Sequence, residues 1–345
     1  MPQASQSDCV YSGADRVVAV GDLHGNHAGL VRILTETGLI DGEGRWRARN
    51  THLVQMGDVL GRGGEPGKIF SLLRRLEAEA PGFGSRVHLL LGNHEAMSIR
   101  GVLRYNTLEE FHDLAAETLA DGGDWTCVRE GARGSDRKDA PGEGDSAPGS
   151  VAARREGDPD CGRESAGGAD QAAGKFGRRL EMMGAREFHA LLSPRGKIGS
   201  WLAAHDSAVA VDGHLFVHGG LDRAHGLMPL AELNAHVRED LAREGGDDAP
   251  GMLRSEGPQW NRDYLLKPAR GKGEELREVL AYHGCLRMVV GHTPTSCIDP
   301  DRQGRIIPLY GGSLYCIDTG IGLAYGGRLS ALIVEGGKAF PRYFG

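Results

Sequence analysis

The chain has 345 residues, of which 40% are apolar and 25% charged, enough for one large α/β domain or two small ones. Its formal net charge of −7 argues against a nucleic-acid partner, because such proteins need a basic surface to neutralise phosphates. We find neither an apolar run near the roughly 20 residues that span a bilayer nor a secretory signal, so we expect no membrane partner and a cytoplasmic location, with an organelle possible.

In chain order, five short apolar segments have the length and the β-branched or leucine-rich composition of buried strands. They are RVVAV (16–20), HLVQM (52–56), RVHLLL (86–91), HLFVH (214–218) and RMVV (287–290). Two amphipathic helical patterns, 27–40 and 65–80, lie between the first three of them. This alternation of strand and helix predicts an α/β unit.

The apolar residues of each helical pattern fall on one face. In 27–40 they are Leu30, Ile33 and Leu34. In 65–80, which has Pro66 at its start, they are Ile69, Leu72, Leu73 and Leu76. We expect these faces to cover a sheet.

The composition changes sharply over residues 129–175, where Val151 is the only aliphatic residue larger than alanine and no aromatic residue occurs. Such a segment cannot bury enough surface to offset its ordering entropy, so we predict a disordered insertion, or a docking arm that orders on a partner. A helix is expected over 179–192. The glycine-rich segment 310–337 is expected to form antiparallel strands that complete a second sheet.

The six cysteines, two of them (Cys127 and Cys161) beside or within this insertion, include no CxxC pair. Zinc-ribbon and thioredoxin-like sites are therefore excluded, and we expect free thiols in a reducing compartment.

Each of the five strands is followed at once by residues that bind metals or phosphate. The loops read GDLHGN (21–26), GDVLGRG (57–63), GNHE (92–95), HGG (218–220) and GHT (291–293). Open α/β sheets place their sites beyond the carboxyl ends of the strands, so the five loops are predicted to meet at one site. Each motif alone is weak, but five in this order are specific.

The loops supply carboxylate, imidazole and amide groups as candidate metal ligands: Asp22, His24, Asp58, Asn93, His218 and His292. This mixed nitrogen and oxygen set suits manganese, iron or zinc better than a thiolate site would. Six ligands are too many for one tetrahedral ion, and a carboxylate can bridge two, so we expect two metal ions. The planar guanidinium of Arg62 is suited to phosphate oxygens.

These motifs resemble the phosphoprotein phosphatase branch of the calcineurin-like metallophosphoesterases, whose signature is GDxHG, GDxxDRG, GNHE, HGG and a late metal histidine. More narrowly, LLLGNHEAMSIRGVLRY, GPQWNRDY (257–264), VVGHTPT and IDTGIGLAYGG are similar to the Shewanella-like, or bacterial-type, protein phosphatases. The likeness spans 16–345 apart from the insertion. It implies an α/β/β/α sandwich of two mixed β-sheets flanked by helices, forming one catalytic domain over residues 1–345.

The resemblance divides the ligands between the two ions. Asp22 and His24 would bind the first ion, and Asp58 would bridge both. The second ion would be bound by residues from three later loops: Asn93, His218 and His292.

The resemblance also assigns the groups that act on phosphate. His94 would be the general acid that protonates the leaving oxygen, and Arg62 and Arg262 would hold the phosphate. Glu95 is expected to support its loop through hydrogen bonds rather than to perform chemistry.

The sequence departs from the family pattern at Gly61, where GDxxDRG has its second aspartate. In the family that aspartate contacts the GNHE histidine, which it would orient and keep protonated. Three interpretations stay open: an active enzyme that is slow on poor leaving groups, replacement by another carboxylate such as Glu65, or a binding protein with little turnover. If the enzyme is active but slow on poor leaving groups, Gly61→Asp is expected to speed alkyl phosphate hydrolysis more than aryl phosphate hydrolysis. A glycine is also suited to a positive φ.

We therefore predict a phosphoric monoester hydrolase acting on phosphoproteins at Ser/Thr, Tyr or both, in one step through activated water and without a phosphoenzyme. Manganese is the expected metal, with iron or zinc as alternatives. The symmetrical diadenosine-tetraphosphatase branch also lacks the aspartate at position 61, so nucleotide hydrolysis stays open. A weakly active phospho-binding scaffold is the third possibility.

Overall fold

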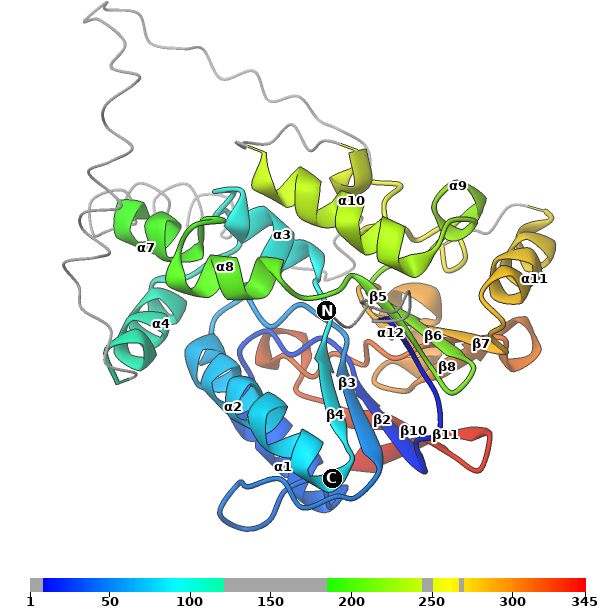
Figure 1. Ribbon diagram of the computed structural model, residues 1–345, viewed down its shortest axis with the longest axis horizontal. Coiled ribbons are helices and arrows are strands. Elements are labelled where there is room, and N and C mark those ends of the chain that lie inside the picture. The colour runs from blue at the N-terminus through cyan, green and yellow to red at the C-terminus, as the bar shows by residue number, and fades with distance from the viewer. Residues whose placement is uncertain (1–8, 121–184, 244–250, 267–269) are drawn as a thin grey trace, which may run out of the picture.

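The computed structural model describes residues 9–120, 185–243, 251–266 and 270–345, and these form two facing mixed sheets with helices outside them (Figure 1). The insertion predicted over 129–175 lies outside the described residues, as do Cys127 and Cys161. Four cysteines lie within the described ranges, at positions 9, 285, 297 and 316, and none of them is in a disulfide.

The five-stranded sheet has the order β11-β10-β2-β3-β4. Its parallel strands are β2 (Arg16–Val20), β3 (Thr51–Gln55) and β4 (Arg86–Leu89). They match the first three predicted strands to within two residues at each end. Two antiparallel strands complete it, β10 (Leu329–Glu335) against β2 and β11 (Lys338–Phe344) at the edge.

The six-stranded sheet has the order β1-β5-β6-β7-β9-β8. Its strands are β1 (Val10–Tyr11), β5 (Ala208–Val211), β6 (His214–Val217), β7 (Arg287–Val290), β8 (Ile307–Leu309) and β9 (Leu314–Cys316). The central strands β6, β7 and β9 run parallel, while β5 and β8 are antiparallel to their inner neighbours.

The expectation for segment 310–337 was wrong in one respect, because its strands do not complete a single sheet. β9 pairs in parallel with β7, whereas β10 crosses to the other sheet and pairs antiparallel with β2. β10 is buried along most of its length, and pairing with β2 places it in the interior of the five-stranded sheet, between β2 and β11.

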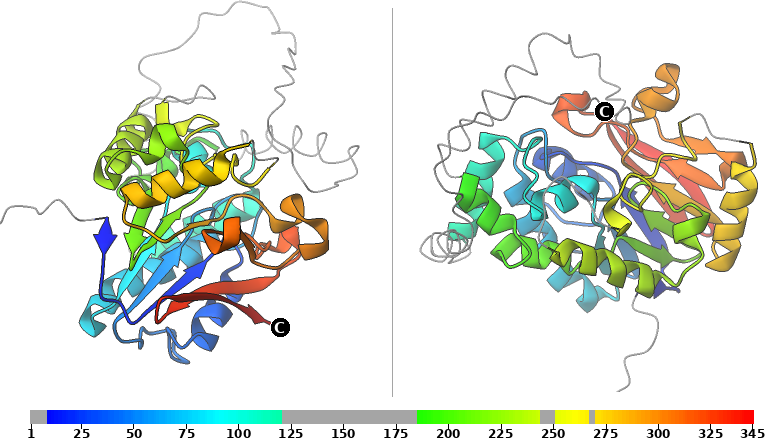
Figure 2. Two further views of the ribbon diagram at one scale, coloured as in Figure 1. Left: turned by 90° about the vertical axis from the view of Figure 1, so that its right-hand side faces the viewer. Right: turned by 90° about the horizontal axis from the view of Figure 1, so that it is seen from above.

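The helices lie around the two sheets (Figures 1 and 2). Their bounds are α1 (His27–Glu36), α2 (Pro66–Glu79), α3 (Asn93–Ile99), α4 (Leu108–Ala120), α7 (Ala185–Leu192), α8 (Lys197–Ala203), α9 (Arg223–Gly226), α10 (Leu230–Ala242), α11 (Lys272–Tyr282) and α12 (Thr295–Ile298). Short 3-10 helices are η1 (Ala80–Phe83), η3 (Gly251–Leu253), η4 (Pro300–Arg302), η5 (Tyr310–Gly312) and η6 (Leu323–Tyr325). The apolar faces predicted for α1 and α2 are buried. No helix in the described ranges is long and apolar enough to cross a membrane.

Alternation along the strands places apolar side chains on both faces of the five-stranded sheet. Val17 and Val54 pack between the sheets with Phe216 of β6, whereas Val18 and Leu53 belong to the larger core under the helices. Both faces of β2 and β3 are therefore buried, which explains why these two strands read as continuous apolar runs. Polar groups are left at the strand ends.

Candidate active site

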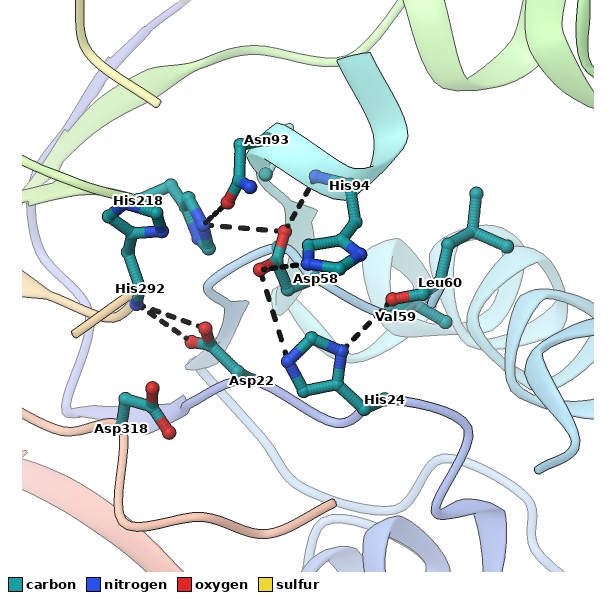
Figure 3. A network of polar contacts seen from close by, with 12 residues as sticks. Asp22, His24, Asp58, Val59, Leu60, Asn93, His94, His218, His292 and Asp318 are labelled. Carbon is teal, nitrogen blue, oxygen red and sulfur yellow. Dashed lines mark hydrogen bonds and ion pairs between the residues drawn. The ribbon is translucent and has the colours of Figure 1, made fainter. Parts of the chain in front are cut away.

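The six predicted metal ligands come together where the carboxyl ends of strands from both sheets meet (Figure 3). The five-stranded sheet supplies four, from the loops after β2, β3 and β4: Asp22, His24, Asp58 and Asn93. The six-stranded sheet supplies two, from the loops after β6 and β7: His218 and His292. All six are buried, so the site lies inside the sandwich rather than on its surface.

Asp58 lies at the centre of the site. Its Oδ2 is 4.0 Å from His24 Nε2, and its Oδ1 is 3.3 Å from His218 Nε2. Two groups of potential ligand atoms share it, His24–Asp58–His94 and Asp58–His218–His292, and within each group all atoms lie within 4.8 Å of one another. One carboxylate common to two such groups is the arrangement that a bridging ligand requires.

The imidazoles present their Nε2 atoms to the site. His24 Nδ1 is 3.0 Å from the Leu60 carbonyl oxygen, and His218 Nδ1 is 2.8 Å from that of Met56. A carbonyl oxygen can only accept, so each Nδ1 carries a hydrogen, and His24 Nε2 keeps its lone pair for a metal ion. His218 Nε2 lies 2.9 Å from Asn93 Oδ1 and 3.3 Å from Asp58 Oδ1, so it carries a proton that a metal ion would replace. His292 Nε2 is buried and has no hydrogen-bond partner within the described residues, as expected of a ligand atom.

The charges of the site also fit cations. Burial raises the pKa of Asp22 well above its ordinary range, and the neighbouring Asp318 carboxylate raises it further. Burial opposes a charge on His218, but Asp58 and Asp22 outweigh it and raise the pKa of that imidazole to about 10. Clustered carboxylates thus stabilise a positive charge here, which bound metal ions would supply.

Backbone strain is concentrated at the same place. Seven non-glycine residues of the described chain have positive φ, and four of them are site residues: His24 (41°), Asp58 (51°), Arg62 (75°) and His292 (63°). A left-handed conformation costs an ordinary residue roughly 1 kcal/mol or more, and it persists only where surrounding contacts enforce it. The loops are therefore held in conformations that present these side chains to the centre.

His94 is the second residue of α3 and lies beside Asp58, to which its backbone N–H donates at 3.0 Å. Its ring lies 4.9 Å from the His24 ring between centroids, and its Nε2 is 3.9 Å from Asp58 Oδ2. Burial lowers the pKa of His94 to about 3 against the attraction of Asp58. By distance, the His94 imidazole could be a third ligand beside His24 and Asp58. Its assignment as a proton donor instead of a ligand comes from the family resemblance.

The His94 ring occupies the space that a side chain at position 61 would need. A Cβ atom on Gly61 would lie 2.0 Å from His94 Nδ1, and Gly61 has φ +81°. The structure therefore removes the basis for expecting Gly61→Asp to help His94. The Glu65 carboxylate does not replace the missing aspartate either, because it is directed to other partners. It pairs with Lys68, and its Oε2 lies 3.9 Å from His27 Nδ1.

Glu95 supports the loops, as expected. Its carboxylate accepts the backbone N–H groups of Asp58, Val59 and Leu60 at 2.8–2.9 Å, and that of Gly92 at 3.0 Å. The side chain is fully buried. It thus joins the loop after β3 to the start of α3 and fixes Asp58 relative to His94.

Arg62 and Arg262, the predicted phosphate-binding groups, are both half-buried beside the ligands. The Arg62 guanidinium carbon lies 4.7 Å from the Tyr105 ring centroid and 5.7 Å from that of Tyr325. Tyr325 also packs on the His24 ring, at 5.2 Å. Arg62 is therefore placed between two aromatic rings at the edge of the ligand cluster.

Arg262 reaches the site through a close approach of two loops. The backbone N–H of Gly219 donates to the Pro258 carbonyl at 2.8 Å, and a Cβ on Gly219 would lie 2.9 Å from Asn261 N. Segment 257–264 therefore packs directly on the HGG loop. After burial, the Arg262 charge is the largest influence lowering the pKa of His292, so the guanidinium lies close enough to the ligands to act on their charge.

Two residues of the site were not predicted. Tyr105 packs on His94 as well as on Arg62, and only spatial proximity reveals it. Asp318 is buried beside Asp22 (Figure 3). Asp318 had a usable signal, because it follows β9 just as the predicted ligands follow their strands.

Two facing mixed sheets, with a buried histidine and aspartate cluster at their shared carboxyl edge, define a metallophosphoesterase. The family model for calcineurin-like phosphoesterases matches residues 15–150, which contain the first three motifs. The chain therefore contains a calcineurin-like metallophosphoesterase domain.

Relatives support the narrower resemblance to Shewanella-like protein phosphatases. Shewanella-like protein phosphatase 2 of Arabidopsis thaliana is 34% identical over 81% of this chain and 66% of its own length. Shewanella-like protein phosphatase 1 of Plasmodium berghei is 39% identical over 29% of each chain. This chain thus spans about two thirds of the plant protein and under a third of the other.

The fold is also found in a solved structure. A cold-active protein-tyrosine phosphatase of a psychrophilic Shewanella species superimposes with a TM-score of 0.66. The alignment covers 98% of this chain and 83% of that one at 21% identity. This likeness confirms the predicted sandwich of two mixed sheets flanked by helices.

Proposed function

We propose that the chain is a metal-dependent protein phosphatase that hydrolyses phosphate monoesters on Ser/Thr, Tyr or both. The observation that carries the proposal is the position of Asp58 between two groups of buried imidazoles. The names of the relatives in Arabidopsis and Plasmodium support a phosphoprotein substrate.

The proposed ligands divide into two sets that share Asp58. Asp22 and His24 would hold one ion with it. The other ion would be held by residues from α3 and the six-stranded sheet: Asn93, His218 and His292. When bound, such a pair of ions lowers the pKa of a water molecule and neutralises charge on phosphoryl oxygens. Manganese is our first choice, and iron or zinc would suit the same donors.

Arg62 and Arg262 are proposed to bind the phosphate from two sides of the ligand cluster. A guanidinium matches two phosphate oxygens at once, and partial burial strengthens the contact by reducing competition from water. The rings of Tyr105 and Tyr325 hold Arg62, and the packing of segment 257–264 on the HGG loop holds Arg262. Because both side chains are held before substrate arrives, the entropy cost of binding is lower.

His94 is proposed to protonate the leaving oxygen. Burial lowers its pKa, so the neutral imidazole must take up a proton from solvent before it can act as an acid. The negative charge of a bound phosphate would favour the protonated form, because an opposite charge within a few ångströms stabilises the imidazolium. His94 then gives that proton to the alcohol or phenol oxygen as it leaves.

Direct transfer of the phosphoryl group to water is supported by the state of the nearby thiol. Cys316 is fully buried and its Sγ–H donates to the Thr293 carbonyl. Burial raises the pKa of this thiol well above its ordinary range, which disfavours the thiolate that a nucleophile requires. We therefore propose a single displacement without a phosphoenzyme.

The test is a substrate comparison with the purified chain in manganese, iron and zinc. Phosphoserine, phosphothreonine and phosphotyrosine peptides are compared with diadenosine tetraphosphate at equal concentration. We expect phosphopeptides to be the better substrates by kcat/KM. Faster cleavage of the tetraphosphate would favour a nucleotide hydrolase, and no turnover by metal-loaded protein would favour a phospho-binding scaffold.

A further inference from the structure

The loop that carries Arg62 has an unusual backbone. Four successive residues have positive φ: Gly61 (81°), Arg62 (75°), Gly63 (107°) and Gly64 (82°). Glycine adopts such angles at no steric cost, but Arg62 does not. The conformation of Arg62 must therefore be enforced by contacts outside the loop.

Four successive backbone N–H groups of this loop donate to acceptors elsewhere in the chain. Arg62 donates to the Tyr105 carbonyl at 2.9 Å, and Glu65 to the Gly25 carbonyl at 2.8 Å. Between them, Gly63 donates to Glu110 Oε1 at 2.7 Å and Gly64 to Glu109 Oε2 at 3.3 Å. Three of the four acceptors belong to segment 105–110, at the start of α4.

Glu110 is the strongest of the side-chain contacts. It is 0% exposed, whereas Glu109 lies at the surface and makes the longer bond. A carboxylate that accepts a backbone N–H in a buried place forms a stronger hydrogen bond than a neutral acceptor does.

The carboxylate of Glu110 is itself held on its other side. Its Oε2 accepts from Asn106 Nδ2 at 2.9 Å, and Asn106 Oδ1 accepts from Ser98 Oγ at 3.1 Å. Ser98 lies on α3, the helix that begins with Asn93 and His94. Glu110 therefore links the Arg62 loop to the helix that carries the proposed general acid.

We infer that Glu110 is a positioning residue of the active site, whose carboxylate holds the Gly63 amide and so fixes Arg62 for phosphate binding. This inference rests on the proposed role of Arg62. The hydrogen bonds of Glu110 go to Gly63, Asn106 and Thr107 and not to a proposed metal ligand, so its effect passes through the loop backbone. Removing the acceptor would let Arg62 relax towards the ordinary right-handed region and draw its guanidinium away from the site.

The test compares Glu110→Gln with a matched control on the same helix, Glu117→Gln. Glu117 lies two turns further along α4 and accepts from Ser71 Oγ of α2 at 2.7 Å, away from the Arg62 loop. Glutamine at position 110 has one acceptor oxygen where the carboxylate has two, so its NH₂ group faces either the Gly63 N–H or the N–H donors of Asn106 and Thr107. The affinity of metal-loaded protein for inorganic phosphate is measured by calorimetry, together with KM and kcat for an aryl phosphate.

We expect Glu110→Gln to weaken phosphate binding and raise KM by about tenfold, with kcat changed less and metal content unchanged. Glu117→Gln should leave phosphate affinity and KM at the wild-type values. In an Arg62→Ala background, Glu110→Gln should have no further effect on phosphate affinity, because the two residues act through one contact.

Two results would overturn the inference: an unchanged phosphate affinity in folded Glu110→Gln, or an effect of equal size in the Arg62→Ala background. If Glu110→Gln does not fold, Glu110→Asp is read in the same way, since it keeps the charge and withdraws the carboxylate by one methylene. A wild-type protein that neither binds phosphate nor hydrolyses phosphate esters would instead refute the proposed function.

Discussion

The imidazole of His94 lies directly over the Cα atom of Gly61, so that a Cβ at position 61 would sit 2.0 Å from Nδ1. The glycine is therefore part of how this site holds His94, in place of the aspartate that the family pattern has there. A residue with any side chain must displace the imidazole, which is buried between Asp58 and the ring of His24.

Gly61→Ala is predicted to lower kcat by about 10- to 100-fold, because a general acid displaced by an ångström loses much of its effect. Gly38→Ala is the control, since Gly38 has a similar φ of +71° with nothing within 4 Å of its Cβ position. Steady-state kinetics and thermal unfolding of both variants separate the steric effect from the backbone cost. Wild-type turnover by Gly61→Ala would contradict the placement of His94.

His94→Asn is predicted to reduce kcat for a phosphoserine peptide by about 10²- to 10⁴-fold, the usual contribution of general acid catalysis. The loss should be smaller with p-nitrophenyl phosphate, whose leaving group needs little protonation. Metal content, measured alongside, should stay at the wild-type level. Equal losses on both substrates, or loss of metal, would make His94 a ligand rather than a proton donor.

Glu95→Gln is predicted to destabilise the fold by about 1–3 kcal/mol, because its carboxylate accepts four backbone N–H groups in a buried place. A glutamine would direct an NH₂ group at some of those donors. Glu232→Gln, at an exposed position in the first turn of α10, should change stability by less than about 0.5 kcal/mol. Denaturant unfolding of the two variants is the measurement, and equal stability would refute the supporting role.

Glu110 is predicted to make stability depend on pH. Burial raises the pKa of this carboxyl to about 7 from an ordinary value of about 4.5, despite its hydrogen bonds from Gly63, Asn106 and Thr107; Glu95 is the neighbouring charge. Between these values the folded state binds the proton more tightly than the unfolded state. This group therefore adds stability below about pH 4.5 and loses that contribution as the pH rises towards 7.

Glu110→Gln lacks this titration, so the difference in unfolding free energy between it and the wild type reports on Glu110 alone. As the pH rises from 5 to 8, the difference should move in favour of the variant, by about 1.4 kcal/mol for each pKa unit of the shift. A difference that does not change with pH would show that Glu110 titrates normally.

The sequence predicts most of what positions the site, because that information is local. An apolar run followed by GDLHGN or GNHE marks both a strand and the end at which its ligands emerge. The pairing of β10 with β2 is not local, since it depends on which strand offers a free edge. The strand β5, AVAV, is too short and too uniform to be separated from its surroundings by periodicity.

Gly61 and Glu110 show where a single sequence reaches its limit. From the sequence, glycine at position 61 is interpreted as the loss of an aspartate that assists His94. The structure shows that the His94 ring occupies the space that an aspartate side chain would need. Glu110 belongs to an ordinary amphipathic helix by pattern, and only the fold brings it to the Gly63 amide. Asp318, in contrast, follows β9 and could have been found by extending the strand-end rule to a sixth strand.

The most direct test of the two-metal account is metal analysis with phosphopeptide turnover for wild type and Asp58→Asn. Asp222→Asn is the control, because Asp222 also contacts a histidine but caps α9 away from the site. We expect two metal ions per wild-type chain. Asp58→Asn should lose metal and lower turnover by at least about 100-fold, whereas Asp222→Asn should leave both unchanged. Full metal content and full turnover in Asp58→Asn would contradict the two-metal account.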